Sequence, residues 1–108
     1  MDNIEFNEFL KLDIRIGKVV YCEKIEGTEN LLKLEVDTGS EVRTLVAGLA
    51  KKYSPEDLNG RQVPVLCNLN PRRIRGVLSQ GMILASGEDD FPVLLMPESP
   101  LAPGSRVR

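Results

Sequence analysis

The chain is organised around the stretch Asn68-Leu69-Asn70-Pro71-Arg72-Arg73-Ile74-Arg75-Gly76-Val77-Leu78-Ser79-Gln80-Gly81-Met82. Three arginines, Arg72, Arg73 and Arg75, lie within four positions of one another. No acidic residue occurs between Arg61 and Gly87, although the whole chain carries a formal net charge of −2. A cationic segment on an acidic protein indicates a polyanionic partner, and we expect the backbone of RNA.

The charge is unevenly distributed along the chain. Residues 1–60 contain eight Lys/Arg and twelve Asp/Glu, residues 61–87 contain four Arg and no acid, and residues 88–108 contain two Arg and four acids. The three segments therefore carry −4, +4 and −2, which sum to the net −2. Most of the surface should repel nucleic acid while one face attracts it, so we expect salt-sensitive binding that depends on geometry.

The totals indicate a single folded domain over residues 1–108, because 108 residues of ordinary apolar content are enough for one core. Cys22 and Cys67 are far apart and lack metal-ligand spacing, so we expect two reduced, buried thiols and not a disulfide. The acidic start of the chain does not resemble a signal peptide, and no apolar run is long enough to span a membrane. These features predict a cytoplasmic protein without membrane contact.

The sequence contains no histidine. This excludes His-based acid–base catalysis, Ser-His and Cys-His nucleophile pairs, and most zinc sites. The acids are scattered singly, so paired-carboxylate chemistry is not indicated either. We therefore expect a protein that is not an enzyme and needs neither a cofactor nor a metal.

The hydrophobic pattern predicts an all-β fold. Alternation of apolar and polar residues indicates strands at residues 13–21 and 32–37. Apolar segments bounded by turns indicate three more strands, at residues 42–47, 62–69 and 82–86. Ser54-Pro55-Glu56-Asp57 predicts the start of one short helix between the third and fourth strands, ended by Gly60. Five strands in this order, with the helix in this place, predict an OB-fold, which is a small Greek-key barrel.

Three local features refine this prediction. The alternation of the first strand changes phase at Gly17, which indicates a β-bulge there. Pro64 lacks an N–H and predicts an unpaired side on the fourth strand. Asn7 is expected to cap a single helical turn that directs Phe9 and Leu10 toward the barrel.

The barrel does not account for the apolar N-terminal turn or for a further apolar strand at residues 91–96. Such extensions either cover an open end of the barrel or bury themselves against a second copy. We expect them to form the interface of a two-fold homodimer, since this is the commonest closed assembly. Covering by the same chain is the alternative.

The basic stretch directly follows the fourth strand, so it corresponds to the loop between strands 4 and 5, a ligand-binding loop of OB-folds. Pro71 stiffens its entry, which lowers the entropic cost of presenting the three arginines. Asn68, Ser79 and Gln80 bracket it with groups suited to sugars and base edges. Lys33, on the outer face of the second strand, is a candidate for the same surface. The alternative for the arginines is an ordinary solvated surface.

The aromatic residues discriminate between kinds of RNA. None of the five aromatics, Phe6, Phe9, Tyr21, Tyr53 and Phe91, lies within residues 61–87. Proteins that bind single strands stack bases on aromatic side chains. Unless the fold brings Tyr21 or Tyr53 alongside the arginines, this chain should instead recognise the phosphates, 2′-hydroxyls and shape of a folded RNA. Met82 either lies against a base or sugar or is a buried strand residue.

Several segments resemble a known family of tRNA-binding domains. They are residues 9–19, residues 30–34, residues 43–48, residues 53–61, Asn68-Leu69-Asn70-Pro71-Arg72 and Ser79-Gln80-Gly81-Met82. The family includes stand-alone dimeric tRNA-binding proteins, the C-terminal domain of many methionyl-tRNA synthetases and the endothelial-monocyte-activating polypeptide domain. Together these segments cover almost the whole chain and are highly specific.

The resemblance implies an OB-fold with N- and C-terminal extensions that form a homodimer. It also implies binding to the outer corner of the L-shaped tRNA, specific for structure and largely independent of sequence. The family's binding positions fall on Lys33, Asn68, Arg72, Arg73, Ser79 and Met82, and from the residues themselves we add Arg75 and Gln80. The chain has Asn70 where the family usually has lysine, and Arg75 where the family often has a neutral residue.

The same family contains a dimeric, export-related chaperone that binds peptides. Its members typically depart from Ser-Gln-Gly-Met, which this chain retains at residues 79–82. Peptide chaperoning is therefore the alternative function. A third alternative is a partner that docks onto an aminoacyl-tRNA synthetase and delivers tRNA to it.

Overall fold

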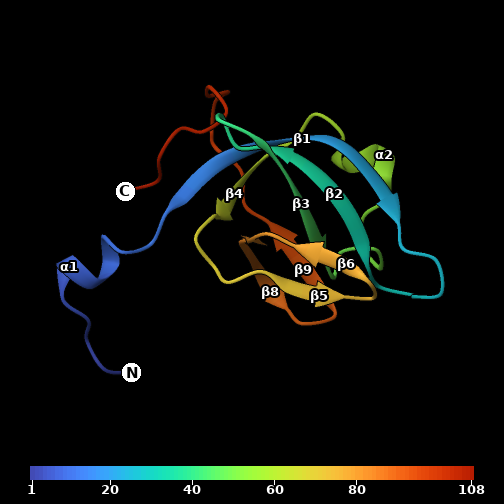
Figure 1. Ribbon diagram of the computed structural model, residues 1–108, viewed down its shortest axis with the longest axis horizontal. Helices are drawn as coiled ribbons and strands as arrows, with labels where there is room; N and C mark the ends of the chain where they lie inside the picture. The colour runs from blue at the N-terminus through green and yellow to red at the C-terminus, as the bar shows by residue number, and fades with distance from the viewer.

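A computed structural model describes residues 1–108. Five strands form one antiparallel sheet in the order β3-β2-β1-β4-β7. Their bounds are β1 Ile14–Lys24, β2 Leu32–Asp37, β3 Val42–Ala47, β4 Gln62–Leu66 and β7 Met82–Ile83. The first half of β1 pairs with β4 and its second half pairs with β2, so this long strand curves and the sheet coils into a barrel (Figure 1). The predicted OB-fold is confirmed.

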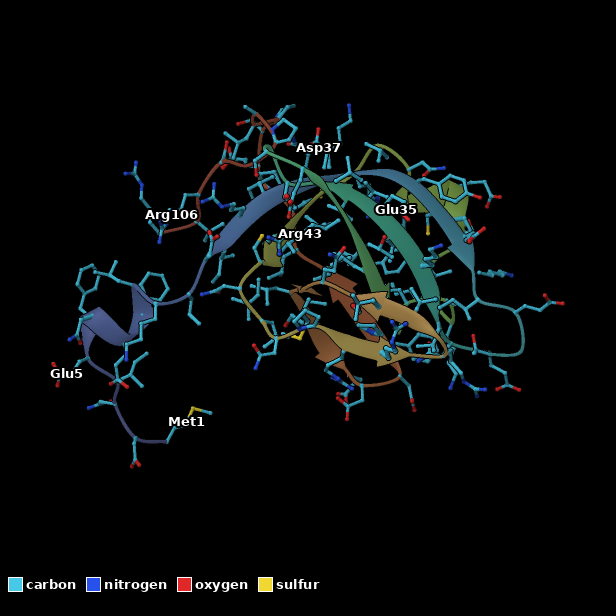
Figure 2. The ribbon with its side chains drawn as sticks, viewed as in Figure 1. Met1, Glu5, Glu35, Asp37, Arg43 and Arg106 are labelled. Atoms are coloured by element: carbon cyan, nitrogen blue, oxygen red, sulfur yellow. The ribbon has the colours of Figure 1, made fainter.

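The barrel closes where β3 meets the segment before β7. The Gln80 N–H donates to the Thr44 carbonyl at 2.9 Å, and the Gln80 side-chain oxygen accepts the Thr44 N–H at 3.2 Å. Arg43, labelled in Figure 2, belongs to β3, and its guanidinium donates to the carbonyls of Cys67, which follows β4, and Gln80. The bonds of Arg43, Thr44 and Gln80 therefore join β3 to the segment before β7, in place of a continuous ladder of strand hydrogen bonds.

The core forms inside the barrel. Leu32, Leu34 and Val36 of β2 are fully buried and alternate with half-buried polar residues, as the sequence predicted. One contiguous cluster contains these three together with Val19, Cys22, Leu45, Leu49, Leu58, Val63, Val65, Cys67 and Leu94. Both cysteines are free and buried, which confirms the prediction for them.

The first strand contains a bulge, but not at Gly17. Val19 pairs with Val36 and Tyr21 pairs with Glu35, which leaves Val20 unmatched. Gly17 keeps its register with β4, and a Cβ at this position would lie 2.5 Å from Cγ1 of Val36. The glycine is required by close packing against β2, and for this reason the expectation of a bulge at Gly17 was wrong.

The short helix α2, Pro55–Leu58, begins and ends as predicted. The Asp57 carboxylate accepts the Ser54 N–H at 3.0 Å, and Gly60 follows the helix with a φ of 85°. Leu58 is fully buried and attaches the helix to the core.

The N-terminal helix α1, Phe6–Phe9, differs from the prediction. Glu5 and Glu8 form its capping box, so Asn7 lies inside the helix and is not the cap. Figure 1 shows α1 standing away from the barrel, with residues 10–13 between them. Phe6 is 72 % exposed and Leu10 is 50 % exposed, so Leu10 is not packed on the barrel as expected. No element of the same chain covers this helix.

Two hairpins complete the fold. The stretch predicted as a loop contains β5, Arg72–Ile74, and β6, Val77–Ser79, which pair with each other. The predicted last strands form β7, then β8 at Ala85–Glu88, which pairs with β9 at Phe91–Leu94.

The predicted fourth strand is also shorter. The Cys67 N–H still donates to the Asp13 carbonyl in register with β1, but the Asp13 N–H donates to the Asn68 side chain and the Cys67 carbonyl accepts from Arg43, so the ladder ends there.

The C-terminal segment pairs with the free edge of β1. The Gly104 N–H donates to the Ile16 carbonyl at 2.7 Å, and the Ile16 N–H donates to the Ser105 carbonyl at 2.8 Å. The same chain therefore covers residues 104–107 and, through the buried Leu94, part of the predicted strand at residues 91–96, whereas it does not cover α1. Neither helix has the length and apolar character needed to cross a membrane.

Candidate nucleic-acid interface

The β5–β6 hairpin presents the three arginines on different sides. Arg72 pairs with Ser79 and Arg73 with Leu78, and opposite residues of an antiparallel pair point to the same face. Arg72 and Ser79 therefore share one face of the hairpin, and Arg73 lies on the other. Arg75 occupies the turn at its tip, where it and Gly76 have φ values of 52° and 79°.

None of these arginines is paired with an acid. The ion pairs in the structure join Arg15 to Asp13, Lys33 to Glu23 and Arg43 to Glu41. Arg72, Arg73 and Arg75 are exposed, and the one internal contact among them is from Arg73 to the Gly76 carbonyl at 3.4 Å. Because no carboxylate neutralises them, the hairpin is a free cationic projection that can contact phosphates.

A groove of about 370 Å³ runs between the hairpin, the end of β3 and the β8–β9 hairpin. Arg72 and Met82 line it, and so do Glu88 and Asp89 of the β8–β9 turn. The local sequence around the arginines contains no acid, yet the fold brings two carboxylates to the same groove. Met82 is 46 % exposed in β7, so it is not a buried strand methionine.

The three polar residues that bracket the arginines make internal hydrogen bonds. The Asn68 side chain accepts the Asp13 N–H at 2.9 Å and donates to the Lys11 carbonyl at 2.6 Å. The Ser79 hydroxyl accepts the Val46 N–H at 3.0 Å and donates to the Gly81 carbonyl at 3.3 Å. With the bonds of Gln80 described above, these side chains hold the base of the hairpin against β3 and the N-terminal segment.

Lys33 lies beside this groove. It is opposite Val46 on β3, and Val46 lines the groove together with Arg72. Its ammonium lies 3.9 Å from Oε1 of Glu23, which is opposite it on β1. The structure thus brings Lys33 near the hairpin, but in an ion pair that the sequence did not indicate.

Sequence reasoning missed Arg43, Glu88 and Asp89. Arg43 fixes the barrel where the hairpin begins, and a cation among the otherwise neutral residues 42–47 was the only signal for it. The Glu88-Asp89 pair was assigned to a turn, and no local pattern indicates which groove a turn will border.

The two thiols are poor candidates for chemistry at this site. Burial raises the pKa of the Cys22 thiol to about 11 and also raises the pKa of Cys67. Thiolate is the reactive form of cysteine, so both residues should be unreactive near neutral pH.

A five-stranded Greek-key barrel with exposed cations between its fourth and fifth strands, here β4 and β7, is the architecture of the OB-fold domains that bind nucleic acids. Residues 14–106 match tRNA_bind, a family of tRNA binding domains. The chain belongs to this family. The predicted resemblance is thereby confirmed.

The similar proteins include parts of synthetases and stand-alone chains. The methionine–tRNA ligase of Bacteroides fragilis is 45 % identical over 107 residues, which are 98 % of this chain and 16 % of the ligase. The chain thus spans about a sixth of the length of the curated relatives it matches.

Two solved structures align over nearly their whole length. The MetRS-related protein from Pyrococcus horikoshii has a TM-score of 0.93 and 37 % identity, with complete coverage of both chains. The chaperone CsaA from Bacillus anthracis has a TM-score of 0.91 and 33 % identity, and covers 99 % of this chain and 100 % of its own.

Proposed function

We propose that this chain binds folded tRNA at the outer corner of the L, specifically for structure and largely independently of sequence. The observation that carries the proposal is the β5–β6 hairpin, whose three exposed arginines have no acidic partner in a chain of the tRNA-binding family. Phosphate contacts position a protein without reading sequence, so such a hairpin suits an RNA recognised by its shape.

The arrangement of the hairpin supports contact with more than one RNA strand. Arg72 and Arg73 lie on opposite faces and Arg75 lies at the tip. A projection with cations on both faces and at its tip can contact phosphates of two backbone segments at once. The outer corner of tRNA, where two loops meet, brings two such segments together.

The remaining residues of the proposed interface surround the hairpin. Met82 offers an exposed thioether on the groove wall for a base or sugar. Asn68, Ser79 and Gln80 contribute first by fixing the hairpin, since their side chains are already hydrogen-bonded. Lys33 extends the interface onto the outer face of β2.

The test replaces two arginines at once. Arg72→Ala with Arg73→Ala should weaken binding of every tRNA by roughly tenfold or more, because two charge-assisted contacts are lost. With about four to five phosphate contacts per subunit, the log–log salt slope of the unaltered protein should be roughly −3 to −4.5, and the variant should lose about 2 of it. Filter binding or fluorescence anisotropy over a salt series measures both.

The matched control is Arg106→Ala with Arg108→Ala. It removes the same two charges from the C-terminal segment, where Arg106 lies beside the start of β1 (Figure 2). This control should keep its affinity within about twofold. A loss confined to one tRNA species, or binding that barely depends on salt, would contradict the proposal.

The proposal extends to assembly and setting. We infer a homodimer formed through α1 and the C-terminal extension, acting in the cytoplasm without catalysis of its own, and serving an aminoacyl-tRNA synthetase as one use of the bound tRNA. The similarity to a methionine–tRNA ligase supports the last point. A pull-down that identifies RNA and protein together tests it.

One observation favours a second candidate, a dimeric chaperone for peptides. The chaperone CsaA shares this fold at 33 % identity, and the groove beside the hairpin is partly walled by apolar residues such as Leu49 and Leu69. The two functions are separated by competition between folded tRNA and an unfolded peptide. Tight peptide binding that tRNA cannot displace would support the chaperone and count against tRNA binding.

A further inference from the structure

The outer face of β1, β2 and β3 continues from the groove. On this face Glu23 lies opposite Lys33 and Tyr21 lies opposite Glu35. Across to β3, Lys33 lies opposite Val46, and Val46 lines the groove. Val46 therefore connects the groove beside the hairpin with the outer face of the barrel.

This face holds an aromatic side chain suited to bases. Tyr21 is 50 % exposed, and its ring is one strand away from Lys33 through the Glu23 pairing. An exposed aromatic next to a cation is what single-strand binders use, since the ring stacks a base and the cation holds the adjacent phosphate. No local pattern in the sequence places Tyr21 near Lys33, and it is the pairing of β1 with β2 that brings the two together.

Glu23 contacts both Tyr21 and Lys33, the two side chains that such a site would use. One carboxylate oxygen accepts the Tyr21 hydroxyl at 3.1 Å, and the other lies 3.9 Å from Nζ of Lys33. The hydrogen bond and charge of Glu23 also raise the pKa of Tyr21. A second carboxylate of the face, Glu35, accepts the Thr44 hydroxyl at 2.9 Å and has no cation.

The face carries three carboxylates, Glu23, Glu35 and Asp37, and two cations, Lys18 and Lys33. Lys18 lies opposite Asp37, and Lys33 forms an ion pair with Glu23. A phosphate approaching Lys33 meets the repulsion of Glu23 at nearly the same distance, so the attraction is largely cancelled.

The hairpin arginines form no ion pair, although Glu88 and Asp89 border the groove that Arg72 lines. The charge pattern therefore favours RNA at the hairpin, and it leaves Lys33 and the barrel face to an RNA that the hairpin already holds.

We propose that Glu23 is a specificity-determining residue that keeps single-stranded RNA off the outer face of β1–β2–β3, and so restricts the protein to folded RNA held at the hairpin. The inference rests on the proposed RNA binding and names the residue that sets its selectivity. Without the charge of Glu23, Tyr21 and Lys33 would form a binding site for single-stranded RNA.

The test is Glu23→Gln, because glutamine keeps the acceptor for the Tyr21 hydroxyl and removes only the charge. The probes are an unstructured oligouridylate of about ten nucleotides and a folded tRNA, each titrated at low and moderate salt. The variant should bind the oligonucleotide about two- to fivefold more tightly, and this gain should exceed any gain for tRNA. Adding Lys33→Ala to Glu23→Gln should abolish the gain.

The matched control is Glu35→Gln. Glu35→Gln removes one negative charge from the same face, but Glu35 has no cation partner to release. Lys33→Ala should therefore have the same small effect on oligonucleotide binding in the Glu35→Gln variant as in the unaltered protein. The inference is overturned if Glu23→Gln leaves oligonucleotide affinity unchanged, if the gain survives Lys33→Ala, or if Glu35→Gln produces the same gain. Tyr21, Glu23 and Lys33 are surface residues, and an unchanged melting temperature verifies folding.

The two proposals fail separately in this experiment. If the unaltered protein does not bind tRNA, or if Arg72→Ala with Arg73→Ala has no effect on it, the proposed function is wrong. If tRNA binding behaves as expected but the oligonucleotide results do not follow Glu23 and Lys33, only the role of Glu23 is wrong.

Discussion

Ser79 shows how one residue can belong to a site without facing the ligand. Sequence reasoning assigned it to RNA contact because a hydroxyl beside arginines suits sugars and bases. In the structure it is 5 % exposed, and its hydroxyl accepts the Val46 N–H and donates to the Gly81 carbonyl. A sequence lists the hydrogen-bonding capacity of a side chain, but the partner depends on which strand the fold brings beside it.

Ser79→Ala should therefore reduce stability. The Val46 N–H would lose its partner in a closed part of the barrel, which costs about 1–3 kcal/mol. Urea denaturation measures the loss. Ser86→Ala is the control, since this exposed serine of β8 makes no internal hydrogen bond and should change stability by less than about 0.5 kcal/mol. Weaker tRNA binding with unchanged stability would show that Ser79 contacts RNA directly.

At the scale of elements, the β5–β6 hairpin was foreseen in its charge but not in its shape. Its turn residues are Arg75 and Gly76, both with positive φ, as a two-residue type I′ turn requires. The usual signal for this turn is Asn-Gly or Asp-Gly, and arginine at the first position is rarely accommodated there. Arg75 is the one non-glycine residue of the chain with positive φ, which indicates that its charge at the tip is worth some local strain.

Arg75→Asn separates the charge from the turn. Asparagine tolerates positive φ, so the hairpin should be kept and the melting temperature should stay the same or rise. The lost cation should reduce the salt slope for tRNA by about 1. Arg75→Lys is the control and should keep the affinity within about twofold. If Arg75→Asn binds tRNA as well as the unaltered protein at every salt concentration, Arg75 does not contact the RNA.

The other elements divide by how local their signals are. β2, β3 and α2 were predictable from short local signals. These are the strict alternation of β2, the turn at residues 38–41 that precedes β3, and the Ser-Pro-x-Asp cap of α2. The bulge at Val20 was not, since it is defined by the register with β2. The sequence analysis joined β7 and the start of β8 into one strand at residues 82–86, and it extended β9 to residue 96. These strand ends also depend on pairing and not on a local pattern. The candidate site followed this division. The cluster of arginines was evident from the sequence, whereas the positions of Glu88 and Asp89 in the groove of Arg72, and of Glu23 beside Lys33, were not.

For the whole molecule, the apolar surface of α1 remains to be explained. Phe6 and Phe9 stack with their ring centroids 6.4 Å apart, yet Phe6 and Leu10 are largely exposed because no part of the same chain covers them. Met96 and Leu101 of the C-terminal segment are also exposed. Exposed apolar groups in this number are typical of a surface that another molecule covers.

Sedimentation at micromolar concentration should therefore give a dimer. Phe6→Ser with Leu10→Ser should shift it toward the monomer while leaving the barrel folded, because neither side chain belongs to the core. Val42→Ser is the control, as Val42 is an exposed apolar residue on the barrel itself and should leave the dimer intact. A monomeric unaltered protein would exclude this assembly.

The side-chain amide of Asn68 connects the N-terminal segment to the start of the hairpin. It is bonded at once to Lys11 and to Asp13, on the path from α1 to β1, and it lies four positions before Arg72. A displacement of that path is therefore transmitted to the root of the hairpin. If two copies meet through α1, pairing and RNA capture become linked equilibria, and each must strengthen or weaken the other by the same factor. The dimer dissociation constant measured with and without tRNA would give that factor, and Asn68→Ala should bring it toward one.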